Sequence, residues 1–176
     1  MDIFSFARQK EEAAEKTYRQ LAEQADTPGL RHIFTYLADM EHRHAQVVSA
    51  MSEGADADLE EPSLDQAQSM FNRLAADKDR VLGEQRRQVD VYKQALQMEK
   101  DSLQFYREQA SQTESEENRM IFQQLAEQEK MHYILVDNMV QFVMQPEVWV
   151  ESPEFSHILD KYRGTDYYPG MMEYDI

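Results

Sequence analysis

The chain has 176 residues and a formal net charge of −16, which comes from 34 acidic and 18 basic side chains, and it contains no cysteine. A field of that sign repels phosphate backbones and anionic lipid headgroups, so nucleic acids and membrane surfaces are poor partners. The lack of cysteine excludes disulfides, zinc ribbons and four-cysteine iron sites.

The composition favours one all-helical domain. Glycine and proline number five each, fewer than the many turns of a sheet protein require, and the length suffices for a single core. Residues 1–8 lack the basic region and apolar run of a secretory signal, and no apolar run is long enough to span a bilayer. We therefore expect a cytoplasmic protein.

The first two predicted helices cover residues 2–24 and 28–53, and the short turn between them favours an antiparallel pair. Thr27 before Pro28 is typical of a helix N-terminus, and Gly54 is expected to end the second helix. The inner stripe of the first helix is predicted to hold Phe6, Ala7, Glu11, Ala14, Tyr18, Leu21, Ala22 and Ala25. That of the second is predicted to hold Ile33, Phe34, Leu37, Met40, Glu41, His44, Val47, Val48 and Met51.

A long connection follows, with an acidic loop over residues 55–62 and a further helical piece over 63–76. The third helix is expected over residues 84–112, although Gly83 leaves its start open. Its inner stripe is predicted to hold Val91, Tyr92, Ala95, Met98, Glu99, Leu103, Tyr106 and Ala110. The fourth helix is expected over residues 115–144, where Pro146 stops it, and it carries Glu129 and His132.

The remaining segment has a different composition, rich in tryptophan, tyrosine and phenylalanine with interspersed proline and glycine. We predict an irregular aromatic tail over residues 146–176, after a bundle over residues 1–145. The tail is too aromatic for a solvated linker. It is expected to pack on the bundle or on a second subunit.

The two halves of the chain repeat each other at an offset of 88 residues. Glu129 and His132 follow Glu41 and His44 by that distance, and Glu99 follows Glu11. The same offset relates Tyr18, Arg19, Ala22, Arg31, Ile33, Phe34, Leu37 and Ala38 to Tyr106, Arg107, Ala110, Arg119, Ile121, Phe122, Leu125 and Ala126. The sequence therefore predicts an antiparallel four-helix bundle made of two duplicated helix pairs, joined by a long helical crossover.

Each half supplies one lone glutamate and one Glu-x-x-His pair, whose members lie one turn apart on the same side of a helix. The predicted metal ligands are Glu11, Glu41, His44, Glu99, Glu129 and His132. Four carboxylates and two imidazoles are the ligand set of di-metal helical bundles, and four negative charges balance two divalent cations. We expect Glu41 and Glu129 to bridge the two ions, since they lie at the heart of the two motifs.

Other interpretations of these residues remain. A single Glu-x-x-His pair is common on charged helices, and a duplicated fold could keep the pattern for packing, although packing does not require buried acids. Tyr18 and Tyr106 are either core residues or hydroxyl groups near the ligands. Glu12, Glu15, His32 and His42 have no equivalent in the second half, and His157 has no identified partner.

The pattern resembles the rubrerythrin branch of the ferritin-like superfamily, and more narrowly its small members without a rubredoxin domain. The resemblance is carried by Glu99, Lys100, Phe105, Tyr106, Arg107, Phe122, Leu125, Ala126, Glu129 and His132, and by Glu11, Tyr18, Arg19, Phe34, Leu37, Ala38, Glu41 and His44 in the first half. It implies a non-haem di-iron centre, often in a dimer, that cycles between diferrous and diferric forms with peroxide or O₂ as oxidant. Leu96 and Ser102 stand three residues from Glu99, where rubrerythrins proper have a further carboxylate. The missing rubredoxin iron implies that a separate protein donates electrons.

The leading functional hypothesis is therefore a redox enzyme that holds two iron ions and reduces peroxide, or oxidises Fe²⁺ with O₂ or peroxide. The alternative is a binding module in which the same ligands hold iron, manganese or zinc without turnover. A third interpretation is a dimerising bundle without a metal role. The expected partners are metal ions, an external electron donor protein and a second copy of the chain in a homodimer.

Overall fold

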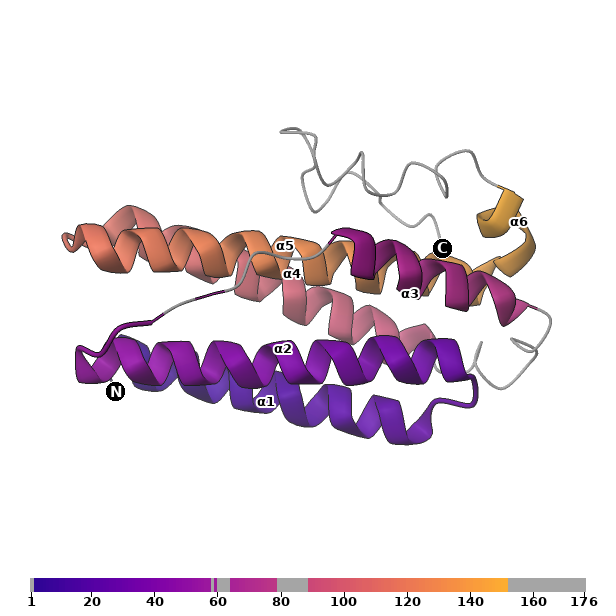
Figure 1. Cartoon of the computed structure of the whole chain (residues 1–176), viewed down its shortest axis with the longest axis horizontal. Helices are drawn as coiled ribbons and strands as arrows, with labels where there is room; N and C mark the ends of the chain where they lie inside the picture. Colours follow the sequence, from indigo (N-terminus) through magenta and orange to yellow (C-terminus); the bar gives the residue numbers. More distant parts are fainter. Residues whose placement is uncertain (1, 58, 60–63, 79–88, 152–176) are drawn as a thin grey trace.

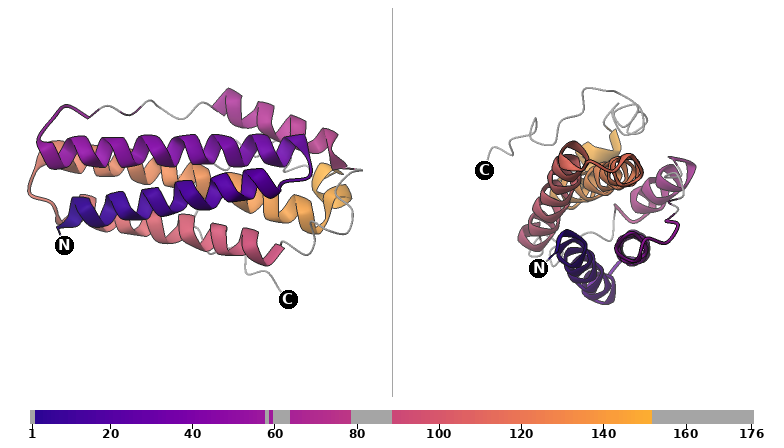
Figure 2. Two further views of the ribbon diagram at one scale, coloured as in Figure 1. Left: turned by 90° about the horizontal axis from the view of Figure 1, so that it is seen from below. Right: turned by 90° about the vertical axis from the view of Figure 1, so that its left-hand side faces the viewer.

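Two long helix pairs form the body of the protein in the computed structural model, which describes residues 2–57, 59, 64–78 and 89–151. The first pair is α1 (Ile3–Gln24) with α2 (Pro28–Glu53), and the second is α4 (Val89–Gln112) with α5 (Glu116–Met144). Both pairs are antiparallel, and they lie side by side in a four-helix bundle (Figures 1 and 2). The described residues contain no strand, so the predicted all-α fold class is confirmed.

The helix ends follow the capping residues of the sequence. The side chain of Asp2 accepts hydrogen bonds from the backbone N–H groups of Phe4 and Ser5, and Thr27 does the same for Leu30. Gly54 ends α2 at φ 64°, a left-handed conformation that glycine adopts without steric penalty. Ser115 caps α5 and accepts from the N–H of Asn118. The predicted boundaries are thus right to within a residue or two, except at residues 84–88, which lie outside the described residues.

Two further helices cover one end of the bundle, where α1 turns into α2 (Figures 1 and 2). These are α3 (Leu64–Ala76), in the predicted crossover, and α6 (Pro146–Glu151). The sequence predicts irregular structure after residue 145, and α6 corrects the first part of that prediction. Pro146 interrupts α5 but also fits the first turn of a new helix, where its missing N–H has no intrahelical role. The rest of the predicted tail, residues 152–176, lies outside the described residues.

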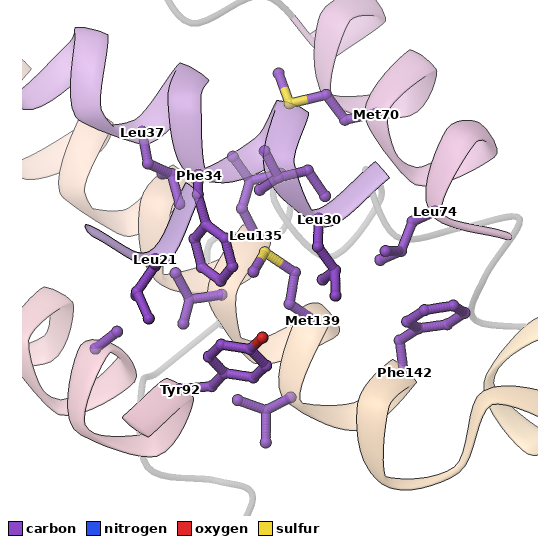
Figure 3. Close-up of a cluster of buried hydrophobic side chains, with 14 of the residues drawn as sticks. Leu21, Leu30, Phe34, Leu37, Met70, Leu74, Tyr92, Leu135, Met139 and Phe142 are labelled. Carbon is purple, nitrogen blue, oxygen red and sulfur yellow. The ribbon is translucent and has the colours of Figure 1, made fainter. Parts of the chain in front are cut away.

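The covered end contains a large apolar group to which all six helices contribute, here called the end cluster (Figure 3). Its members include Leu21, Leu30, Phe34, Leu37, Met70, Phe71, Leu74, Tyr92, Leu135, Met139, Phe142 and Trp149. Trp149 of α6 lies against Phe71 of α3 and Phe142 of α5, with ring centroids 6.0 and 5.2 Å away. Its indole N–H also donates to the side-chain oxygen of Asn138 at 3.3 Å. The start of the predicted tail therefore packs on the bundle.

A close contact joins α3 to the N-terminus of α2. The backbone N–H of Gly29 donates to the carboxylate of Asp77 at 2.7 Å in a buried position. A Cβ at residue 29 would lie 2.7 Å from that oxygen and 3.1 Å from the Cα of Leu74. Glycine is thus required for the approach of α3 to α2.

A second apolar cluster fills the other end of the bundle and includes Ala7, Val47, Val48, Met51, Leu103, Tyr106, Phe122 and Leu125. Phe6 and Val91, which the sequence analysis placed on inner stripes, are 45% and 41% exposed. Each immediately precedes a buried residue, Ala7 or Tyr92, and neighbours on a helix point about 100° apart. None of the helices in the described ranges has the length and apolar character needed to cross a membrane.

Candidate metal centre

The six residues predicted as metal ligands meet between the two apolar clusters. Each long helix contributes: α1 provides Glu11, α2 provides Glu41 and His44, α4 provides Glu99, and α5 provides Glu129 and His132. All six side chains are at most 1% exposed. We call these six residues the carboxylate–histidine centre.

The imidazole of His44 faces carboxylates from three helices. Its Nδ1 lies 2.8 Å from an oxygen of Glu129, 3.4 Å from Glu11 and 3.7 Å from Glu41. Because α1, α2 and α5 each supply one of these groups, carboxylates from both halves of the chain converge on His44.

His132 has an equivalent surrounding, related to the first by the duplication. Its Nδ1 lies 2.9 Å from an oxygen of Glu41, 3.6 Å from Glu99 and 3.9 Å from Glu129. The two imidazole rings stack with centroids 5.2 Å apart. Glu41 and Glu129 therefore belong to both sets of contacts, whereas Glu11 and Glu99 each belong to one.

Most of these close atoms make no hydrogen bonds. Within the described residues, the buried polar atoms without a hydrogen-bond partner are one carboxylate oxygen of each of the four glutamates, Nδ1 of His44, and both ring nitrogens of His132. An unsatisfied buried polar atom costs about 1–3 kcal/mol, and more when it is charged. Carboxylate oxygens and imidazole nitrogens that approach one another within 4 Å without forming hydrogen bonds can direct their lone pairs into a shared space, which is the arrangement that a cation needs.

The donor set also suits metal ions chemically. Glu41, His44, Glu129 and His132 each offer one ligand atom, and these four atoms lie within 4.8 Å of one another. Mixed oxygen and imidazole ligands bind iron, manganese and zinc alike. The residues present therefore fit a pair of first-row divalent ions.

The electrostatics of the centre reflect crowded negative charge. Burial, followed by repulsion from Glu99, raises the pKa of Glu41 well above its ordinary value. Burial and repulsion from Glu41 raise the pKa of Glu129 in the same way. For Glu11, burial also acts upward, but contacts with His44 and Glu41 outweigh it and lower the pKa. Burial acts to lower the pKa of His44, but the surrounding carboxylates outweigh it and raise that pKa well above 6.5.

The two duplicated tyrosines contact the centre from the opposite half of the chain. The hydroxyl of Tyr18 donates to Glu99, and that of Tyr106 donates to Glu11. Burial and the charge of Glu99 raise the pKa of Tyr18 well above 10.0, so the phenol keeps its proton and remains a donor. Of the two roles left open by the sequence, the structure shows hydroxyl groups that hold the two lone glutamates, in addition to packing.

The other acidic and histidine candidates lie outside the centre. Glu15 contacts His42 at 3.0 Å and Arg19 at 3.1 Å near the surface. Glu12 is exposed and His32 is half-buried. His157 lies outside the described residues.

One residue of the site was missed by the sequence analysis. Gln128 is 2% exposed, and its side-chain oxygen lies 2.7 Å from Nε2 of His44. The available signal was its position directly before Glu129, where the first half of the chain has Met40 before Glu41.

A family model described as Rubrerythrin matches residues 2–140. The comparison with curated proteins and the comparison with solved structures each gave no significant match.

Proposed function

The chain belongs to the rubrerythrin family, and on that premise we propose that it is a non-haem di-iron oxidoreductase. Its reaction is the reduction of peroxide, or the oxidation of Fe²⁺ by O₂ or peroxide, at the carboxylate–histidine centre. The proposed ligands are Glu11, Glu41, His44, Glu99, Glu129 and His132.

The observation that carries this proposal is the set of buried atoms without hydrogen bonds. Each of the six side chains contributes one such atom toward the same space. Burial of four carboxylates is unfavourable unless their charge is compensated. Two divalent cations supply an equal and opposite charge.

The protein's own residues would divide the work as follows. Glu41 and Glu129 each approach both imidazoles and would be shared between the two ions. The closer contact of Glu41 is with Nδ1 of His132 at 2.9 Å, and that of Glu129 is with Nδ1 of His44 at 2.8 Å. Glu11 and Glu99 would each bind one ion while a tyrosine hydroxyl holds the other carboxylate oxygen. The two apolar clusters on either side would limit the access of water.

A pair of iron ions bound there would supply the two electrons that, with two protons, convert one H₂O₂ into two water molecules. Those two electrons must be returned to the iron ions before the next turnover. We therefore expect a separate protein to act as electron donor. A homodimer and a cytoplasmic location remain predictions.

The second candidate function is a di-metal binding module without turnover. It is favoured by the choice of ligands, because glutamate and histidine hold zinc or manganese as readily as iron. The positions three residues from Glu99 are taken by Leu96 and Ser102, both buried. The ligand shell therefore lacks the further carboxylate that the sequence resemblance associates with rubrerythrins proper.

Stopped-flow mixing of anaerobically Fe²⁺-loaded protein with H₂O₂ separates the two functions. We expect visible absorbance to develop as about one peroxide disappears per two iron ions. Protein loaded with Zn²⁺, which cannot change oxidation state, is the control and should consume none. If the iron form likewise leaves peroxide untouched, the binding module is the better description.

A further inference from the structure

The two histidines of the centre differ in what their Nε2 atoms contact, that is, the ring nitrogens that do not face the carboxylates. Nε2 of His44 lies 2.7 Å from the side-chain oxygen of Gln128 in a buried position. Nε2 of His132 is buried and has no hydrogen-bond partner among the described residues. The residue of the first half that is equivalent to Gln128 is Met40, 88 residues earlier, and its thioether is only a weak acceptor.

Metal binding requires the neutral imidazole of His44, and in that form the contact with Gln128 determines which nitrogen carries the proton. An amide oxygen only accepts hydrogen bonds, so Nε2 of the neutral imidazole must be the N–H donor. Nδ1 then has its lone pair free, and it faces Glu11, Glu41 and Glu129 at 2.8–3.7 Å. A hydrogen bond at Nε2 also fixes the ring orientation and increases the basicity of the nitrogen that binds metal. His132 lacks this support.

We propose that Gln128 is a positioning residue that makes the two halves of the centre unequal, so that the ion beside His44 binds more tightly than the ion beside His132. This inference rests on the proposed function, because it requires that the centre holds two metal ions. The duplicated backbone supplies similar ligands to both ions. Positions 40 and 128 then distinguish them.

The two positions can be exchanged in a direct test. Glutamine and methionine have similar lengths, and both Met40 and Gln128 line the same cavity of about 370 Å³, so an altered side chain has room to adjust. Gln128→Met removes the acceptor from His44, and Met40→Gln offers an equivalent acceptor to His132. Gln128→Glu keeps an acceptor at the first position and serves as the conservative control.

Anaerobic calorimetric titration with Co²⁺ measures the two binding steps in each protein, and Co²⁺ absorbance reports the surroundings of the first ion bound. We expect two distinguishable steps in the wild type. Gln128→Met should weaken the tighter step by about 10–100-fold, as is typical when the partner of a ligand histidine is lost. Gln128→Glu should retain the tighter step, and Met40→Gln should strengthen the weaker one.

Thermal unfolding of the metal-free proteins shows whether a variant acts only through folding. A positioning role predicts that Gln128→Met weakens metal binding, whereas the Tm of the metal-free protein stays close to that of the wild type. Equal affinities in the wild type, or affinities that Gln128→Met and Met40→Gln leave unchanged, would overturn the inference while the di-metal proposal stands. If the wild type binds no metal at all, the proposed function fails and this inference with it.

Discussion

The end cluster and the carboxylate–histidine centre lie on the same long helices but are stabilised in opposite ways. In the end cluster, apolar side chains from six helices bury one another, and even the indole N–H of Trp149 has an acceptor in Asn138. In the centre, seven buried polar atoms have no hydrogen-bond partner within the described residues. The end cluster thus supplies stability that holds the centre in an unfavourable arrangement, which is how sites prepared for a ligand are commonly maintained.

This contrast predicts that a change in the centre abolishes metal binding while leaving the fold intact. Glu129→Ala removes a carboxylate that approaches both imidazoles, so we expect the metal content to fall from two ions to less than one per chain. The helix content measured by circular dichroism should not change. Metal analysis after anaerobic loading with Fe²⁺ gives the stoichiometry.

The matched control is Glu127→Ala, two residues earlier on the same helix. Glu127 is exposed, and its contact with Lys130 is 4.0 Å long, so this variant should keep both ions. Two tightly bound ions in Glu129→Ala would contradict the assignment of Glu129 as a shared ligand.

A change in the end cluster is expected to do the opposite, lowering stability while leaving metal binding intact. Trp149→Ala removes the ring packed against Phe71 and Phe142, so the free energy of unfolding should fall by about 3–5 kcal/mol. The number of bound metal ions should remain two, because α6 contributes no ligand. Denaturant titration and metal analysis check the two parts of this prediction.

Val148→Ala is the control for that variant, since Val148 is 61% exposed and its removal should change stability by less than about 0.5 kcal/mol. Loss of metal in Trp149→Ala without loss of stability would mean that the two regions are not separable in the way described.

A smaller effect should appear as a dependence on pH. In the metal-free protein the pKa values of Glu41, Glu129 and His44 are raised above 4.5 and 6.5, so the folded state holds extra protons. Their contribution to stability is present below those unfolded-state values and is lost as pH rises through the raised folded-state values. For each extra proton that the folded state holds, the free energy of unfolding falls by about 1.4 kcal/mol for every unit by which the pH rises. Glu11, whose pKa is lowered, acts oppositely and only near pH 4.5 and below.

Metal binding requires that these ligands lose their protons, so the affinity for metal should increase as pH rises through the same pKa values. From pH 6 to pH 8 we expect the Tm of the metal-free protein to fall and the rise in Tm on adding metal to grow. Thermal unfolding with and without Zn²⁺ measures both. A metal-free Tm that climbs across this range would contradict the raised pKa values.

The sequence predicted the centre because its residues are constrained twice, by helical spacing and by repetition at 88 residues. Glu11 and Glu99 stand out from neighbouring acids for the second reason alone. Gln128 escaped notice because its importance lies in a difference between the halves, with Met40 at the equivalent position. Spacing also could not separate Phe6 from Ala7, since adjacent residues compete for one inner stripe and packing decides between them.

Long-range contacts set the remaining limit on prediction. The helical character of α3 follows from local periodicity, but its docking depends on Asp77 reaching the N–H of Gly29, 48 residues away. The helix α6 forms after Pro146, and Trp149 stabilises it through rings on α3 and α5. Neither contact leaves a local pattern in the sequence.

The central claim is tested most directly by anomalous X-ray scattering from crystals loaded with Fe²⁺ under anaerobic conditions, measured on both sides of the iron absorption edge. The account predicts two peaks about 3.5–4 Å apart. One peak should lie beside His44 and Glu11, and the other beside His132 and Glu99. Glu41 and Glu129 should each be adjacent to both peaks. Absence of iron from the bundle interior, or four glutamates turned toward bulk water, would contradict it.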